Sequence, residues 1–396
     1  MTFYRRRRVG AVAHGHAVVV GGGIGGLAAA VALGRRGWRT TILERAPEPR
    51  EVGAGITLMA NGVRGLEALG LGTKLQRIGR ADGPGGLRTR TGRWLSRVDA
   101  EEMSRLLGTT AIGVHRRDLH RLLREALPAE ALRTGCAVQD ADPDSAVVRY
   151  RHAGGSAELH ADLVVGADGI NSVLRTRLWP QLPPPVYGGS TTWRAAVAYD
   201  GPLATAVSWG TGAEFGMVPL GADRVYWYAA LGAAPGGRAA DELALVREHF
   251  GHWHDPIPAL LAATAPDAVL RHDLYHLATP LPSYVRGRVA LLGDAAHAMM
   301  PNLGQGGCQA IEDAVTLGAV ADPNTDVPAA LRAYDQQRRP RSQAVARAAA
   351  QMARYGQQLR NPAAVAVRDT LAWLAPNRAA LRSMARHADW RPPSID

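Results

Sequence analysis

The sequence predicts an α/β protein in which a Rossmann-like domain receives an inserted, mostly antiparallel β-sheet domain and is followed by C-terminal helices. Near the N-terminus, the apolar run Ala17 to Val20 leads into a glycine-rich turn and an apolar helical pattern, which is how a βαβ unit begins. Residues 187–231 hold β-rich segments separated by turn glycines, as is typical of antiparallel strands. Residues 329–355 and 371–388 show helical patterns.

We expect the chain to pass between its two domains more than once. A disordered tail is predicted for residues 1–14. The Rossmann-like domain is expected to comprise residues 15–82, 100–182 and 271–340. Residues 83–99 and 183–270 are assigned to the β-sheet domain, and residues 341–396 to a C-terminal helical segment. These boundaries fall where strand-like alternation begins and at a proline-rich linker.

Composition excludes several classes of function. The net charge is +11, but almost all of the positive charge is arginine scattered along the chain, so no basic face for nucleic acid is predicted. Two cysteines give neither a disulfide framework nor zinc spacing, which fits a reduced, cytoplasmic setting. His252 and His254 form a pair without an evident third ligand, so no metal site is predicted. Uninterrupted apolar runs are too short for a membrane span.

The first glycine-rich turn has the spacing of a dinucleotide-binding fingerprint. Gly21 allows a tight turn, Gly23 lets a pyrophosphate approach the backbone, and Gly26 allows the helix to pack closely on the strand. The next apolar run ends at Glu44, 18 residues after Gly26, where a carboxylate accepts hydrogen bonds from ribose hydroxyls. The turn does not by itself distinguish FAD from NAD. The predicted site comprises Gly21, Gly23, Ile24, Gly25, Gly26, Glu44 and Arg45.

A second passage from strand to helix, between Arg288 and Leu317, is the most informative part of the chain. Its apolar run suits a strand buried on both faces, and it ends at Asp294, where open α/β sheets bind their ligands. The turn from Leu303 to Gly307 then opens a helix, so its backbone N–H groups lie at the positive end of the helix dipole. This turn is predicted to face an anion or an electron-rich carbonyl group.

The second passage, GDAAHAMMPNLGQGGCQAIEDA, resembles the flavin-ribityl motif of the para-hydroxybenzoate hydroxylase-like (group A) single-component FAD-dependent monooxygenases. The resemblance implies that Asp294 binds the ribityl chain and that the turn faces the isoalloxazine ring near N1 and the C2 carbonyl. It also assigns the first turn to the ADP half of FAD, in a GR2/PHBH-type domain. The implied contacts in the second turn are Gly304, Gln305, Gly306 and Gly307.

Three further stretches match the pattern of this family. Gly55 and Ile56 belong to a G-A-G-I loop that runs along the flavin edge in the family, and Arg50 just before it is a candidate for meeting the dinucleotide or the substrate. Arg116 begins an R-x-x-L-x-x-x-L pattern, where a guanidinium suits an FAD phosphate or a ribityl oxygen. Asp168 matches a D-G motif that touches the pyrophosphate in the family, with a tight Asx turn as the structural alternative.

The β-sheet domain is expected to cover the flavin ring and to bind the substrate. Arg194, a polar residue within an apolar strand segment, is the first candidate for orienting a phenolate or carboxylate. Pro301 fixes the chain where the reacting carbon of the substrate should face the ring. Arg194 and Pro301 are therefore the predicted catalytic residues. The predicted substrate contacts are Arg194, Phe215, Met217, Tyr226 and Met300.

The resemblance implies a hydroxylase of an aromatic or polyketide-like small molecule that uses FAD, NADH or NADPH, and O2, through a flavin C4a-hydroperoxide. Such an enzyme serves secondary metabolism or aromatic catabolism. One alternative is a flavin-dependent halogenase, although the sequence lacks its W-x-W-x-I-P motif and has Lys74 as its only lysine. A second alternative is a non-catalytic protein that binds FAD or a ligand. The sequence leaves open the substrate, the choice of NADH or NADPH, and whether the protein is a monomer or a homodimer.

Overall fold

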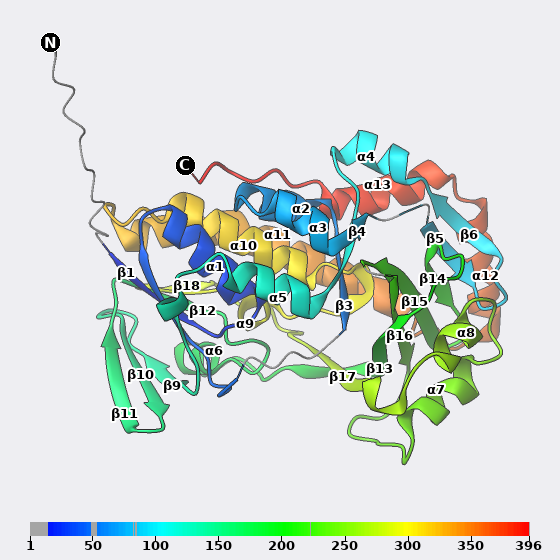
Figure 1. Ribbon diagram of the computed structural model, residues 1–396, viewed down its shortest axis with the longest axis horizontal. Helices are drawn as coiled ribbons and strands as arrows, with labels where there is room; N and C mark the ends of the chain where they lie inside the picture. Colours follow the sequence, from blue (N-terminus) through cyan, green and yellow to red (C-terminus); the bar gives the residue numbers. More distant parts are fainter. Residues whose placement is uncertain (1–14, 49–53, 82, 84, 222, 396) are drawn as a thin grey trace, which may run out of the picture.

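The computed structural model describes residues 15–48, 54–81, 83, 85–221 and 223–395. The tail predicted for residues 1–14 and the candidate Arg50 lie outside these ranges. A six-stranded sheet and a seven-stranded sheet lie at opposite ends of the long axis, with long helices running between them (Figure 1). The predicted class, an α/β domain with an inserted and mostly antiparallel sheet, is confirmed.

The six-stranded sheet is parallel except for one edge strand. Because the parallel strands share one direction, their carboxyl ends lie at one edge, and both glycine-rich turns leave the sheet there. The strands that bear these turns are buried along their whole length, as the apolar runs predicted. The order in space is β18 (Val285–Arg286), β19 (Val289–Leu291), β12 (Leu163–Gly166), β1 (His16–Val20), β2 (Arg39–Leu43) and β8 (Leu132–Arg133), with β18 antiparallel.

The two helices that follow the glycine-rich turns pack against each other. They are α1 (Ile24–Arg35) and α10 (Gly306–Val320). Gly318 permits this close approach, since a Cβ at that position would lie 2.7 Å from the Cβ of Ala32. The other helices of this half of the molecule are α2 (Ala60–Ala68), α3 (Gly72–Ile78), α4 (Ala100–Leu107), α5 (Arg116–Arg124), α6 (Val173–Leu178) and α9 (Asp294–His297), with 3-10 turns η1 (Ala129–Ala131) and η3 (Pro301–Leu303).

The seven-stranded sheet has two covered faces of different character. One face packs against α7 (Glu242–Phe250) and α8 (Ile257–Ala262) through a cluster that includes Phe215 and Trp227. The opposite face carries Val218 and Tyr226, which contact Ala54 of the six-stranded half. This second face is therefore directed toward the glycine-rich turns. The order is β17 (Leu270–His276), β13 (Val186–Ala198), β16 (Arg224–Leu231), β15 (Ala213–Leu220), β14 (Thr205–Trp209), β5 (Gly85–Thr89) and β6 (Trp94–Val98), with only β14 and β5 parallel.

Two predicted domain boundaries need correction. The boundary at residues 270 and 271 falls at the beginning of β17, which pairs with β13 and so belongs to the seven-stranded sheet. The boundary at residues 340 and 341 falls inside α11 (Val327–Tyr355), a single helix that contains Pro340.

The remaining elements are two helices, a 3-10 turn and two three-stranded sheets. The helices are α12 (Pro362–Leu374) and α13 (Asn377–Ala388), and the 3-10 turn is η2 (Pro266–Ala268). One sheet joins β9 (Ala137–Ala141), β10 (Val147–His152) and β11 (Gly155–His160), and the other joins β3 (Gly55–Leu58), β7 (Ile112–His115) and β4 (Gly79–Ala81).

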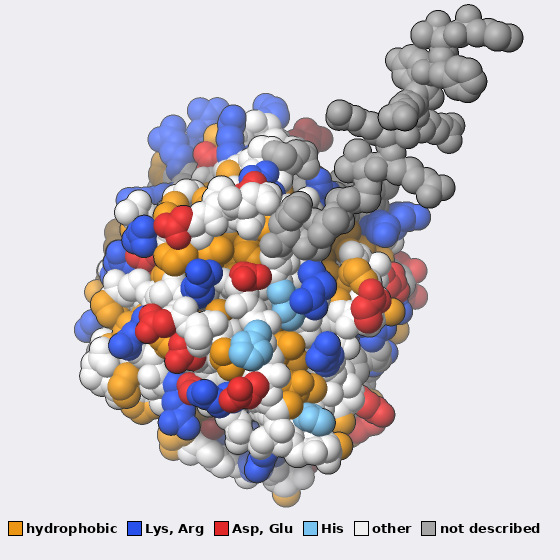
Figure 2. Space-filling model, turned by 90° about the vertical axis from the view of Figure 1, so that its left-hand side faces the viewer, with side chains coloured by type: hydrophobic (Ala, Val, Ile, Leu, Met, Phe, Trp, Pro, Cys, Tyr) orange, Lys and Arg blue, Asp and Glu red, His pale blue; other side chains and the backbone are white. Residues whose placement is uncertain are grey.

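Positive and negative side chains are mixed on the surface. On the face shown in Figure 2, basic and acidic side chains are interspersed over the middle, and several basic side chains lie near one another at the upper edge. Among the helices in the described part of the chain, none has both the length and the hydropathy that crossing a bilayer requires.

Candidate active site

The glycines of the first turn fall into two physical classes. Gly21 has a φ of +105°, and a Cβ on Gly26 would lie 2.0 Å from the carbonyl oxygen of Gly21, so the fold itself requires both glycines. Gly23 differs, because a Cβ there would meet no protein atom within 4 Å. This open space leaves the backbone accessible at the predicted place of the pyrophosphate.

We expect Gly23→Ala to weaken FAD binding roughly tenfold or more without changing the melting temperature of the FAD-free protein. The added methyl group would meet only the ligand. The measurement is a titration of the FAD-free protein with FAD, followed by flavin fluorescence. Gly34→Ala is the matched control, because it lies on the same helix and its Cβ would also meet nothing within 4 Å. An equal loss in both variants would contradict the assignment of Gly23.

Glu44 is fixed at the end of β2 beside this turn. Its carboxylate accepts a hydrogen bond from the Gly22 N–H at 2.8 Å and another from the Ala46 N–H at 2.8 Å. A carboxylate has capacity for further donors, so Glu44 is placed to accept ribose hydroxyls. The sequence did not reveal His120, whose Nε2 lies 2.7 Å from the Gly22 carbonyl oxygen and braces the same turn. Arg45 is exposed next to Glu44.

Asp168 caps a helix in this structure. It accepts hydrogen bonds from the Ser172 hydroxyl at 2.6 Å and the Val173 N–H at 2.7 Å, which lie four and five residues further on and so differ from the tight Asx turn named as the alternative. The buried Arg175 donates to the Ala295 carbonyl oxygen at 3.1 Å and so joins this loop to the loop of Asp294. Gly169, with a φ of +78° and open space beside it, remains the part of the D-G motif that a ligand can approach.

The second turn presents open backbone beside an available carboxylate. Asp294 is exposed, although its neighbours in the chain are buried, and its side chain makes no hydrogen bond to the described residues. Gly304, with a φ of +62°, and Gly306 both have open space where a side chain would begin. At Gly307, in contrast, a Cβ would lie 2.7 Å from Ile56 Cδ1, so this glycine lets β3 approach α10. The donor and acceptor set therefore fits the ribityl and ring portions of FAD.

Arg116, the first residue of α5, combines an exposed side chain with charged and aromatic neighbours. Its side chain is exposed, yet withdrawal from bulk water lowers the pKa of its guanidinium, and the neighbouring Arg194 adds to that effect. Asp294 opposes the shift, which places the two side chains within electrostatic reach of each other. A cation so placed, with a carboxylate nearby, suits the polar parts of a flavin cofactor.

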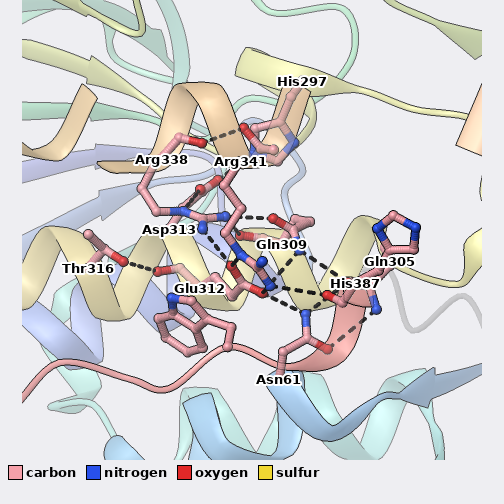
Figure 3. A network of polar contacts seen from close by, with 12 residues as sticks. Asn61, His297, Gln305, Gln309, Glu312, Asp313, Thr316, Arg338, Arg341 and His387 are labelled. Atoms are coloured by element: carbon pink, nitrogen blue, oxygen red, sulfur yellow. Dashed lines mark hydrogen bonds and ion pairs between the residues drawn. The ribbon is translucent and has the colours of Figure 1, made fainter. Parts of the chain in front are cut away.

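A buried polar network that we did not predict supports both flavin-facing loops (Figure 3). Asn61 Nδ2 donates to Gln305 Oε1 at 2.8 Å and to Glu312 Oε1 at 2.7 Å, which ties the second turn to α10. Asp313 accepts the Gly293 N–H at 2.9 Å and contacts His297 Nε2, so it holds the loop of Asp294.

Arg338 of α11 joins the two carboxylates of this network. It contacts Glu312 and donates from Nε to Asp313 at 2.7 Å, and all three side chains are at most 1% exposed. Burial alone would raise the pKa of Asp313, but His297 and Arg338 lower it to about 2. The sequence signal for the network is the acidic pair Glu312-Asp313 within an otherwise apolar helix.

The predicted substrate residues separate onto different sides of the sheet. Arg194 and Tyr226 lie on the face toward the flavin turns, where they share a hydrogen bond, and Arg194 Nη2 lies 3.0 Å from His272 Nδ1. Phe215 and Met217 lie on the opposite face among the residues packed on α7 and α8, so the prediction that they contact substrate is wrong. Strand β15 is buried along both faces, and its apolar sequence therefore does not show which side faces the flavin.

Met300 and Pro301, which precede the second turn, are also only partly placed as predicted. Pro301 is exposed at the start of η3 and stays a candidate for facing the substrate. Met300 is 3% exposed and packs against Ala349 and Ala353 of α11, so it supports this segment from behind instead of lining the site. A residue absent from the prediction, Glu214, is buried on the flavin-facing side of the sheet.

Comparison with known proteins agrees with this geometry. The sequence family described as "FAD binding domain" matches residues 15–349. The aurachin C monooxygenase/isomerase of Stigmatella aurantiaca is 38% identical over 323 residues, which cover 80% of this chain and 83% of that protein. The 2-heptyl-3-hydroxy-4(1H)-quinolone synthase of Pseudomonas aeruginosa is 33% identical over 382 residues, covering 91% and 94%.

A solved structure extends the likeness to three dimensions. Klebsiella pneumoniae HpxO complexed with FAD and uric acid superposes with a TM-score of 0.87 at 29% identity, covering 95% of this chain and 97% of that one. The described protein therefore shares its fold with a structure that holds FAD and an aromatic ligand together.

Proposed function

This chain belongs to the FAD-binding-domain family of FAD-dependent aromatic monooxygenases, and on that premise we propose that its substrate is an oxygen-bearing nitrogen heteroaromatic ring. The enzyme is a flavoprotein hydroxylase of aromatic compounds, with NAD(P)H as the typical reductant of the family. The names of the relatives support the narrower substrate class, because both a quinolone and uric acid contain ring nitrogen and oxygen substituents. The relatives compared here lend no support to the halogenase alternative.

Different residues of the chain bind the cofactor, orient the substrate and limit the access of water. FAD held here and reduced by NAD(P)H would supply the activation of O2, with one oxygen atom going to the ring and the other leaving as water. The N-terminus of α10 at Gly306 stabilises negative charge on the flavin ring, and Asp294 holds the ribityl chain. The seven-stranded sheet covers the ring and limits access of water, while Arg194 orients an oxygen substituent of the substrate.

The test is NAD(P)H oxidation by the FAD-loaded enzyme against a panel of phenols, aromatic acids, pyridones and quinolones, with hydrogen peroxide measured in parallel. We expect a nitrogen heteroaromatic to stimulate oxidation with little peroxide and to yield a hydroxylated product by mass spectrometry. Stimulation confined to phenols or carbocyclic acids would contradict the proposed substrate class. FAD retention without any stimulation would favour the non-catalytic alternative.

We predict that Arg194→Ala raises the KM for this substrate roughly tenfold. The alternative expected result is that a larger share of the NAD(P)H oxidation yields hydrogen peroxide instead of product. The reason is the loss of the guanidinium that holds the substrate oxygen in place. The readout is the ratio of product to NAD(P)H consumed. Arg382→Ala on α13 is the control, because Arg382 is exposed and lies on a different element. Unchanged coupling and KM in Arg194→Ala would remove Arg194 from the site.

We also propose a cytoplasmic location, which suits an enzyme that draws on NAD(P)H. Both cysteines, Cys136 and Cys308, are free and buried in the structure. The proposal is tested by fractionating cells that express the protein and following bound flavin.

A further inference from the structure

Glu214 is a buried carboxyl group on the sheet face that covers the flavin. Its residue is 5% exposed, and strand pairing places it level with Ala230 of β16 and Thr192 of β13. Side chains alternate along a strand, so Glu214 points away from Phe215 and the α7 side. Because the side chain of Ala230 is small, it leaves space on this face of the sheet between Thr192 and Glu214.

The neighbours of Glu214 are hydrogen-bond donors without charge. Trp209 Nε1 donates to it at 2.9 Å, and the Tyr228 hydroxyl and the Asn302 amide also bond to it. Arg368, a cation that acts on Glu214 electrostatically, lies over the Trp209 ring at 4.8 Å from its centroid and pairs with Asp369. Burial raises the pKa of Glu214, and Trp209, Tyr228 and Asn302 oppose that rise. A buried carboxylate without an ion-pair partner is costly to keep, which favours a role in binding over a role in folding.

Buried polar atoms without hydrogen-bond partners lie at both ends of this face, an acceptor at one end and a donor at the other. Beside Glu214, Asn302 Oδ1 is a buried acceptor without a partner. Two strands away, Arg194 Nε is a buried donor without a partner, and Thr192 Oγ1, on the same strand as Arg194 and level with Glu214, is also unpaired. Strand spacing and rise separate the Cα atoms of Arg194 and Glu214 by roughly 12 Å, and both side chains are long enough to reach one small ring system. A ligand that satisfies this face carries a donor at one end and an acceptor at the other.

We propose that Glu214 determines substrate specificity by accepting a hydrogen bond from a ring N–H, while Arg194 donates to an oxygen at the opposite end of the same ring system. This inference rests on the proposed function and narrows it. The substrate is a neutral heteroaromatic in its keto form, with N–H and C=O across the ring from each other. A carboxylate at the Glu214 end is rejected, because two anions would face each other in a site withdrawn from water.

Three probes of similar shape test this inference by titration of the FAD-loaded enzyme, with the flavin absorbance change as the signal. They are 4(1H)-quinolone, chromone, in which oxygen replaces the ring N–H, and chromone-2-carboxylate, which keeps the carbonyl oxygen for Arg194 and places a carboxylate at the Glu214 end. We expect wild-type enzyme to bind 4(1H)-quinolone roughly tenfold or more tightly than chromone, because chromone leaves the carboxylate unpaired. Chromone-2-carboxylate should bind most weakly, because its carboxylate would face that of Glu214.

The variant Glu214→Gln should reduce the preference for 4(1H)-quinolone over chromone several-fold and improve binding of chromone-2-carboxylate, since the amide is neutral and can donate to its carboxylate. Glu248→Gln is the matched control, because Glu248 is exposed on α7 against the other face of the sheet. Its ranking of the probes should equal that of wild type.

The outcomes separate this inference from the proposed function. Equal binding of 4(1H)-quinolone and chromone by wild-type enzyme would overturn the role of Glu214 while the substrate class stands, and this arm needs no variant. Binding of none of the three probes would overturn the substrate class and this inference with it. A Glu214→Gln variant that loses thermal stability but keeps the wild-type ranking would show that Glu214 is structural, and it would likewise overturn the inference.

Discussion

Replacing Arg338 by methionine is expected to lower the free energy of unfolding by about 3–5 kcal/mol, the usual cost of removing one partner from a buried ion pair. Arg338 is 1% exposed and contacts Glu312 and Asp313, both of which have fully buried side chains. Methionine fills much of the same volume without a charge, so the cost comes from two carboxylates left in a dry interior with less compensation. A buried ion pair as a whole contributes little net stability, whereas removing one partner leaves a buried charge without compensation and is costly.

The same substitution should also weaken the hold on FAD. Asp313 accepts the Gly293 N–H next to Asp294, and Glu312 is linked through Asn61 to Gln305 in the second turn (Figure 3). When Arg338 is removed, Glu312 keeps its ion pair with Arg341, whereas Asp313 keeps only the Gly293 N–H and His297. The loop that Asp313 holds is therefore expected to shift. We therefore expect loss of bound flavin together with loss of stability.

The measurements are urea unfolding of the FAD-free protein and the flavin content of the purified protein. Arg332→Met is the control, because Arg332 lies on the same helix, is 65% exposed and meets Asp326 only at 4.0 Å. Surface pairs of that kind contribute about 0–1 kcal/mol. Equal stability of the two variants would contradict the role assigned to the network.

The sequence was sufficient for the parts of the site that depend on backbone geometry. At Gly21 and Gly26 the local chain path permits only glycine, and at Gly23 and Gly304 the open space follows from the same spacing. The burial of β1 and β19 also follows from their uninterrupted apolar runs. Such features depend on residues that are close together in the sequence, so they can be predicted without knowing which distant residues they contact.

The parts that depend on long-range pairing could not be read from the sequence. Phe215 and Glu214 are adjacent, and only the register of β15 against β16 decides that Glu214 faces the flavin side. Both faces of β15 are buried, so the usual alternation of apolar and polar residues is missing. Arg338 likewise looked like one of many scattered arginines, because its partners lie 25 and 26 residues earlier on another helix.

Asp294→Ala is expected to weaken FAD binding roughly 10- to 100-fold, the range for losing charge-assisted hydrogen bonds to the ribityl hydroxyls. Asp294 is exposed and its carboxylate has no hydrogen-bond partner among the described residues, so the fold does not depend on it. The melting temperature of the FAD-free protein should therefore match that of wild type. The measurements are the flavin content after gel filtration and the dissociation constant from FAD titration.

Comparing this variant with Arg338→Met separates cofactor binding from support of the site. Asp294→Ala should lose FAD at unchanged stability, whereas Arg338→Met should lose both, because one residue contacts the ligand and the other holds the loops in place. Asp267→Ala, an exposed aspartate of the 3-10 turn before β17, is the control and should change neither quantity. Wild-type flavin content in purified Asp294→Ala would count against the ribityl assignment. In that case Arg116, which lies within electrostatic reach of Asp294, would be the next residue to replace.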